Sequence, residues 1–118
     1  MKIWIDGSGA LLRGQKARTC VMFDREKPVI DEFRRGTVNE MEYLALSKAL
    51  GDPRSENSVI YSDSQLVVNQ LTKGWKVDAE NLRPLHEECK GLLKSRKATI
   101  VWIRREDNEA GKVLDKRT

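Results

Sequence analysis

Two short apolar runs, each ending in an aspartate, constrain the fold of this chain more than any other feature. Ile3–Ile5 precedes Asp6 and a glycine-rich turn, and the β-branched run Ser58–Ser62 precedes Asp63. Apolar runs of this length, closed by turn residues, predict buried strands. If the two strands are parallel neighbours, both carboxylates lie at the same edge of the sheet, where α/β proteins bind their ligands.

The remaining periodicities predict a five-stranded mixed sheet with helices on both faces. Apolar residues recur at strand or helix spacing, and glycine, proline and polar clusters separate the elements. The predicted order is βββ-α-β-α-α-β-α, an α/β arrangement in one domain that covers residues 1–118. The predicted strands are Ile3–Ile5, Ala17–Phe23, Pro28–Arg35, Ser58–Ser62 and Ala98–Ile103, and the helices are Glu40–Leu50, Ser64–Leu71, Asn81–Lys94 and Asp107–Asp115.

Composition narrows the class of protein. Of the 118 residues, 39% are hydrophobic and 34% are charged, which is typical of a globular domain. The chain has no apolar run long enough for a membrane span and no leader pattern, so we expect a cytoplasmic monomer that makes no membrane contact. Cys20 and Cys89 are far apart in the sequence and are expected to be two separate thiols rather than a disulfide. The net charge of +4 modestly favours a polyanionic partner.

A third acid joins the two strand-end aspartates. Glu42 lies one turn into a predicted helix, between Met41 and Tyr43. Carboxylates held close together repel one another, so either their pKa is raised or a divalent cation neutralises them. Oxygen ligands favour Mg²⁺ or Mn²⁺, and a pair of such ions cleaves phosphodiesters in many enzymes. Three ordinary surface acids at the ends of elements would show the same spacing, and the spacing alone does not separate the two interpretations.

Five motifs resemble those of type 1 ribonuclease H, in its compact archaeal and bacterial form without the basic handle. They occur in the right order over nearly the whole chain, and each falls on the appropriate predicted element, which makes the set specific although each motif alone is weak. The motifs are a "DGS" first strand at Ile5–Ser8, a "TNNxxE" helix entry at Thr37–Ala45, a "TDSQ" segment at Tyr61–Val67, the pair Trp75–Val77 and Asn81–Leu85, and a "WVPREEN-x-A" ending at Trp102–Ala110.

The resemblance implies an activity and a cofactor. Family members hydrolyse the RNA strand of RNA/DNA hybrids with two Mg²⁺ ions and leave a 5′-phosphate and a 3′-hydroxyl; Mn²⁺ is an alternative ion. By this resemblance Asp6 would bridge both ions, and Glu42 and Asp63 would hold the ion nearer the leaving group.

The resemblance also implies a nucleic-acid-binding set. Asn39 and Gln65 match positions that contact the minor groove of the hybrid, and Thr37 matches a position that holds a DNA phosphate. Helix capping by Thr37 or Asn39 and simple solvation of Gln65 are the alternatives.

Three further residues are candidates for nucleic-acid contact from their own chemistry. Trp75, between two lysines, could stack on the DNA strand or anchor the core. Arg104 and Arg105 could bind phosphate or be ordinary surface charges. The other tryptophans, Trp4 and Trp102, lie on predicted strands and are expected in the core.

The resemblance also implies a fourth metal-binding carboxylate in the last helix, and here the sequence departs from the family. Gly111 stands where the family's last helix carries an aspartate. Three hypotheses follow: Asp115, one helical turn further on, replaces the acid as a metal ligand; three carboxylates suffice with weaker binding of one ion; or the chain is a nucleic-acid-binding module that does not cut.

Overall fold

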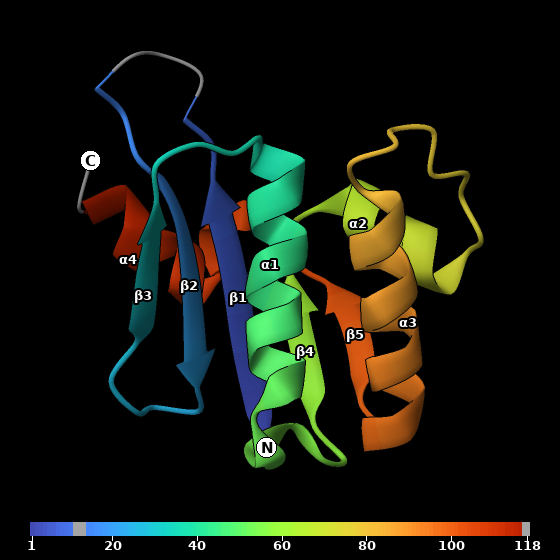
Figure 1. Cartoon of the computed structure of the whole chain (residues 1–118). Coiled ribbons are helices and arrows are strands. Elements are labelled where there is room, and N and C mark those ends of the chain that lie inside the picture. The colour runs from blue at the N-terminus through green and yellow to red at the C-terminus, as the bar shows by residue number, and fades with distance from the viewer. Residues whose placement is uncertain (11–13, 117–118) are drawn as a thin grey trace.

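The computed structural model describes residues 1–10 and 14–116, and its core is a five-stranded mixed sheet (Figure 1). The strand order is β3-β2-β1-β4-β5. The predicted order of elements is confirmed, with ends that differ by a few residues and with two additional short 3-10 helices. The elements are β1 (Lys2–Ser8), β2 (Ala17–Phe23), β3 (Val29–Phe33), α1 (Val38–Gly51), η1 (Pro53–Ser55), β4 (Val59–Ser62), α2 (Gln65–Thr72), α3 (Arg83–Arg96), β5 (Thr99–Trp102), η2 (Arg105–Asp107) and α4 (Glu109–Lys116).

The central strand β1 sets the position of the two aspartates. It pairs antiparallel with β2 and parallel with β4, and in the parallel pair Trp4 lies opposite Tyr61. Asp6 and Asp63 each follow this last printed pair by two residues, so both lie beyond the same end of the paired segment. The carboxyl ends of β1, β4 and β5 and the amino-terminal end of α1 all lie toward the top of Figure 1.

Helices cover both faces of the sheet, as predicted. Because side chains alternate along a strand, Ile3 and Ile5 of β1 face the larger core, which α1 and α3 cover. Trp4 packs on the opposite face, in a smaller cluster with Cys20 of β2 and Leu114 of α4. In Figure 1, α1 and α3 lie in front of the sheet and α4 lies behind it.

Two local features hold α1 against β1 at the edge where the aspartates lie. Thr37 caps the helix: its side chain accepts a hydrogen bond from the backbone N–H of Glu40, and the Glu40 carboxylate accepts one from the N–H of Thr37. Gly7 lets the two backbones approach closely, since a Cβ at this position would lie 2.5 Å from the backbone nitrogen of Glu42. The close approach brings Glu42 beside Asp6.

The expectation that Trp102 lies in the core is wrong, because β5 is an edge strand. In β5 only Ile100 is buried, and the Trp102 side chain is 41% exposed while its indole N–H donates to the backbone carbonyl of Asp63. The core alternative for Trp75 is also wrong, since this side chain is 48% exposed. Trp4 is partly buried and stacks on Tyr61 with ring centroids 5.6 Å apart.

Both cysteines are buried thiols, as predicted. Burial raises the pKa of the Cys89 thiol to about 12. None of the helices in the described part of the chain is long and apolar enough to cross a membrane.

Candidate metal centre

Three carboxylates meet at the carboxyl edge of the central strands. Asp6 lies near the end of β1, Asp63 directly follows β4, and Glu42 lies in the second turn of α1. One ligand oxygen from each lies within 4.8 Å of the others. The geometric expectation from the sequence is therefore met, since the three acids are not separate surface groups.

The centre is buried and electrostatically unfavourable for three ionised acids. Asp6 and Glu42 are almost completely buried, with 0% and 3% of their surface exposed. Burial, reinforced by the charge of Asp63, raises the pKa of the Asp6 carboxyl. Burial, followed by the charges of Asp6 and Asp63, raises the pKa of Glu42 well above its usual range. Two buried oxygens, Oδ2 of Asp6 and Oε2 of Glu42, receive no hydrogen bond from a donor group among the described residues.

The donor set fits a hard divalent cation. All the ligand atoms are carboxylate oxygens, which Mg²⁺ and Mn²⁺ prefer, and the two buried oxygens without a donor are the groups that a cation would satisfy. In the Asp6–Glu42–Asp63 cluster, a bound ion would also remove the mutual repulsion that raises the pKa values.

Arg105 and Asn108 approach the same acids from the last connection. The Nη1 atom of Arg105 donates to Oδ1 of Asp6 at 2.8 Å and to Oδ2 of Asp63 at 2.9 Å. The buried Asn108 side chain donates to Oδ2 of Asp63 at 2.8 Å and to the backbone carbonyl of Ile5 at 2.9 Å. Asn108 thus ties the start of α4 to the end of β1 and orients one of the acids.

The sequence left Arg105 open between phosphate binding and an ordinary surface charge, and it did not single out Asn108. The signal that could have found Asn108 is its place just before a helix: its Oδ1 accepts from the backbone N–H of Ala110, as helix-preceding asparagines commonly do. No sequence signal indicates that the side chain of Arg105 turns toward the acids.

Asp115 reaches the centre through Arg105. Its Oδ1 accepts from Nη2 of Arg105 at 2.7 Å, its side chain is 62% exposed, and it is not one of the three acids that lie within ligand distance of one another. Gly111 faces the same guanidinium, because a Cβ built there would lie 3.2 Å from Nη1 of Arg105.

The other candidate residues for nucleic-acid contact lie around this edge of the sheet or beside it. Thr37 caps α1 and Asn39 lies in the first turn of that helix, so for Thr37 the capping alternative is realised. Gln65 is an exposed residue at the start of α2, directly beyond Asp63 and Ser64. Trp75 is exposed in the connection between α2 and α3, and Arg104 forms ion pairs at its own surface, with Asp107 at 3.0 Å and Glu106 at 3.7 Å.

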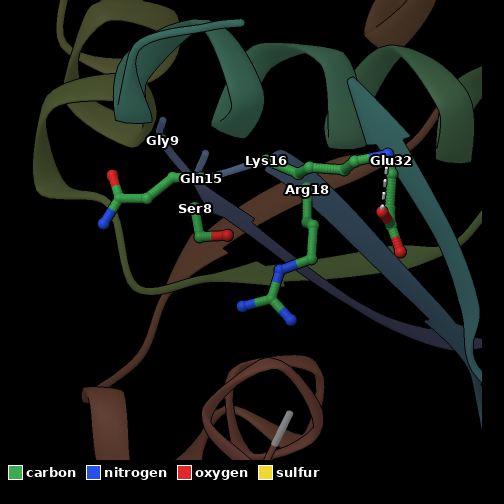
Figure 2. A pocket seen from close by; sticks show the side chains of 6 residues that line it. All are labelled: Ser8, Gly9, Gln15, Lys16, Arg18 and Glu32. Atoms are coloured by element: carbon green, nitrogen blue, oxygen red, sulfur yellow. Dashed lines mark ion pairs between the residues drawn. The ribbon is translucent and has the colours of Figure 1, made fainter. Parts of the chain in front are cut away.

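A pocket of about 330 Å³ lies next to the carboxyl end of β1 (Figure 2). Ser8 and Gly9 form one side, and the long side chains of Lys16 and Arg18 border the other. Glu32 of β3 pairs with Lys16 at 3.9 Å. The lining, which also includes Gln15, is polar, with two basic residues and one acid, and it begins two residues from Asp6.

Comparison with known proteins places this geometry in a family. A family model described as "Reverse transcriptase-like" matches residues 5–118. A protein named ribonuclease H, from Syntrophus aciditrophicus, is 36% identical over 110 residues. The crystal structure of RNase H1 from the halophilic archaeon Halobacterium salinarum superposes with a TM-score of 0.75 at 27% identity, covering 96% of this chain and 92% of that one. The chain belongs to the reverse transcriptase-like family, and its fold is of the ribonuclease H1 type.

The other relatives agree with this ribonuclease H1-type fold. The structure of LC11-RNase H1 in complex with an RNA/DNA hybrid shares the fold, with a TM-score of 0.73, 22% identity, and coverage of 98% and 97% of the two chains. The uncharacterized protein YpeP of Bacillus subtilis is 36% identical over 92 residues. The matched part spans 64% of the Syntrophus protein and 41% of the Bacillus protein, against 79% and 72% of this chain.

Proposed function

We propose that this chain hydrolyses the RNA strand of RNA/DNA hybrids in a reaction that requires a divalent cation. The observation that carries the proposal is the convergence of Asp6, Glu42 and Asp63, with two buried carboxylate oxygens that no donor group in the described part of the chain satisfies. The family of the chain and its relative named ribonuclease H support the substrate class.

The three acids would hold the cation, which is Mg²⁺ or Mn²⁺. Asp6 comes from the central strand β1, Glu42 from α1, and Asp63 from the end of the neighbouring strand β4. When bound, such an ion supplies charge neutralisation at the scissile phosphate and a lowered pKa of a coordinated water. Cleavage would leave a 5′-phosphate and a 3′-hydroxyl, with no covalent intermediate on the protein.

The chain's own residues would orient the hybrid over the acids. Asn39 and Gln65 flank the cluster on α1 and α2, where they could read the minor groove, whose 2′-hydroxyls distinguish RNA from DNA. Thr37 has its side-chain oxygen in the helix cap, and its hydroxyl hydrogen is available for a DNA phosphate.

Aromatic and basic groups would extend the contact beyond the cleavage point. The exposed indole of Trp75 offers a stacking surface, and Arg104 offers positive charge. The pocket bordered by Lys16 and Arg18 offers cationic groups to the backbone of a strand that leaves the centre.

A cleavage assay with a matched control tests the proposal. An RNA/DNA hybrid labelled on the RNA strand should be cut in Mg²⁺ or Mn²⁺, whereas Asp63→Asn should lower the rate by at least about 100-fold, since it removes a charged ligand. Glu56→Gln is the control: Glu56 is an exposed acid beyond the other end of α1, and its loss should leave the rate unchanged. Intact hybrid binding without cleavage in either ion would instead identify a nucleic-acid-binding module that does not cut.

A further inference from the structure

One guanidinium contacts acids from three separate elements. Arg105 donates through Nη1 to Asp6 at the end of β1 and to Asp63 after β4, and through Nη2 to Asp115 on α4. The three donor–acceptor distances are 2.8, 2.9 and 2.7 Å, which is the range of charge-assisted hydrogen bonds. The acids therefore already have a cation among them, and that cation is part of the chain.

The absence of a side chain at position 111 leaves room for this arrangement. A Cβ at Gly111 would lie 3.2 Å from Nη1 and 3.4 Å from Cζ of Arg105, so even a methyl group would crowd the guanidinium. With a side chain at this position, the guanidinium would have to shift by a few tenths of an ångström, so glycine leaves room for the observed position of Arg105.

The guanidinium contacts only some of the carboxylate oxygens of the cluster. Oδ1 of Asp6 and Oδ2 of Asp63 are taken by Arg105, and the second of these also accepts from Asn108. Among the described residues, the buried carboxylate oxygens of this cluster left without a donor are Oδ2 of Asp6 and Oε2 of Glu42. A cation that used these two oxygens would leave the hydrogen bonds of Arg105 in place, whereas an additional ion on Oδ1 of Asp6 and Oδ2 of Asp63 would compete with the guanidinium for them.

The charges lead to the same conclusion. Three carboxylates and one guanidinium leave a formal charge of minus two, which one divalent cation neutralises. Asp115 lies on the far, solvent side of the guanidinium, and its 62% exposure means that solvent screens most of its charge from the centre.

We propose that Arg105 is a built-in cation that takes the place of a second divalent ion, so that the protein without nucleic acid binds a single divalent cation, and that Asp115 anchors Arg105 rather than the metal. The inference rests on the proposed function, because it assumes that the three acids bind metal. It specifies how many ions they bind and which residue sets that number.

The test is a titration of the full chain with Mn²⁺, in the absence of nucleic acid, by isothermal titration calorimetry. The unchanged protein should bind one ion. Arg105→Gln should bind a second ion or bind the first at least about tenfold more tightly, because a positive charge within hydrogen-bonding distance of two ligands has been removed. Lys112→Gln removes a positive charge from the neighbouring helix α4, but Lys112 pairs with Glu109 at 3.2 Å, so this control should match the unchanged protein.

A second variant keeps the test decisive if Arg105→Gln does not fold. Asp115→Asn changes an exposed position, and it should bind Mn²⁺ at least as tightly as the unchanged protein because the anchor of Arg105 is lost while the ligands stay. A loss of more than about tenfold would make Asp115 a ligand and overturn the proposal.

Other outcomes separate the inference from the function on which it rests. Two ions in the unchanged protein, or identical binding by Arg105→Gln, would overturn the role of Arg105 and leave the metal-dependent function standing. No Mn²⁺ binding by the unchanged protein would overturn both.

Discussion

Gly7→Ala tests how the fold places Glu42 beside Asp6. The added methyl carbon would lie 2.5 Å from the backbone nitrogen of Glu42, 2.5 Å from the carbonyl carbon of Met41 and 2.7 Å from the Met41 Cβ. Nonbonded carbons are comfortable at about 3.5–4.0 Å, so the backbones of β1 and α1 would have to separate by roughly 1 Å. The backbone atoms of β1 and α1 cannot move aside as easily as the end of a flexible side chain.

The expected cost is at the upper end of the range for overpacking, about 3 kcal/mol of the free energy of unfolding. With a urea m-value of roughly 1.5 kcal/mol/M, the unfolding midpoint should fall by about 2 M. Circular dichroism during urea unfolding measures this shift. Because α1 carries Glu42, the same variant should also bind Mn²⁺ more weakly than the unchanged protein.

Gly91→Ala is the matched control for this experiment. Gly91 lies inside α3, and a Cβ there would have no atom within 4 Å. Alanine is the better helix former, so this change should raise the free energy of unfolding by about 0.5–1 kcal/mol. If Gly7→Ala unfolds at the same urea concentration as the unchanged protein, the close contact between β1 and α1 is not what positions the acids.

Two further substitutions, at Asn108 and Asp52, and one labelling experiment on the buried cysteines test other parts of the structure. Asn108→Ala removes a buried amide with three side-chain hydrogen bonds and should cost about 1–3 kcal/mol in urea unfolding; a cost below about 0.5 kcal/mol would contradict its role as a tie. Hydrogen bonds from the side chain and backbone of Arg54 lower the pKa of Asp52 from 3.8 to about 2, so its contribution to stability is present above pH 4 and is lost as the pH falls toward 2. Asp52→Asn should therefore show a smaller fall in Tm over that interval, and an equal fall would argue against the assigned hydrogen bonds. Cys20 and Cys89 are completely buried, so neither should react with a thiol reagent at pH 8 until denaturant is added, and prompt labelling of the native protein would show that the core opens.

The acidic cluster could be predicted from the sequence because it depends on backbone topology. Two strands that each end in an aspartate have only one edge at which to meet if they are parallel, and a helix that follows a hairpin run packs across that edge. Thr37, one of the two capping candidates, indicated where the helix begins, whereas the glycines after Asp6 did not mark the end of β1, which continues to Ser8.

The position of Arg105 could not be predicted, because it depends on a side chain rather than on the backbone. A guanidinium on a surface turn can point to solvent, to phosphate or inward, and the choice follows from the space beside Gly111 and from the charges that surround it. Trp102 was misplaced for a related reason: an apolar alternation predicts a strand but does not say that the strand lies at an edge of the sheet.

Anomalous diffraction from crystals of the full chain soaked in Mn²⁺ tests most directly whether the three acids bind metal. We expect an anomalous peak about 2.1–2.3 Å from carboxylate oxygens of Asp6 and Glu42, with Asp63 completing the site and Arg105 still in place. A peak elsewhere on the surface, or no peak at these acids when the soak saturates other sites, would contradict this expectation.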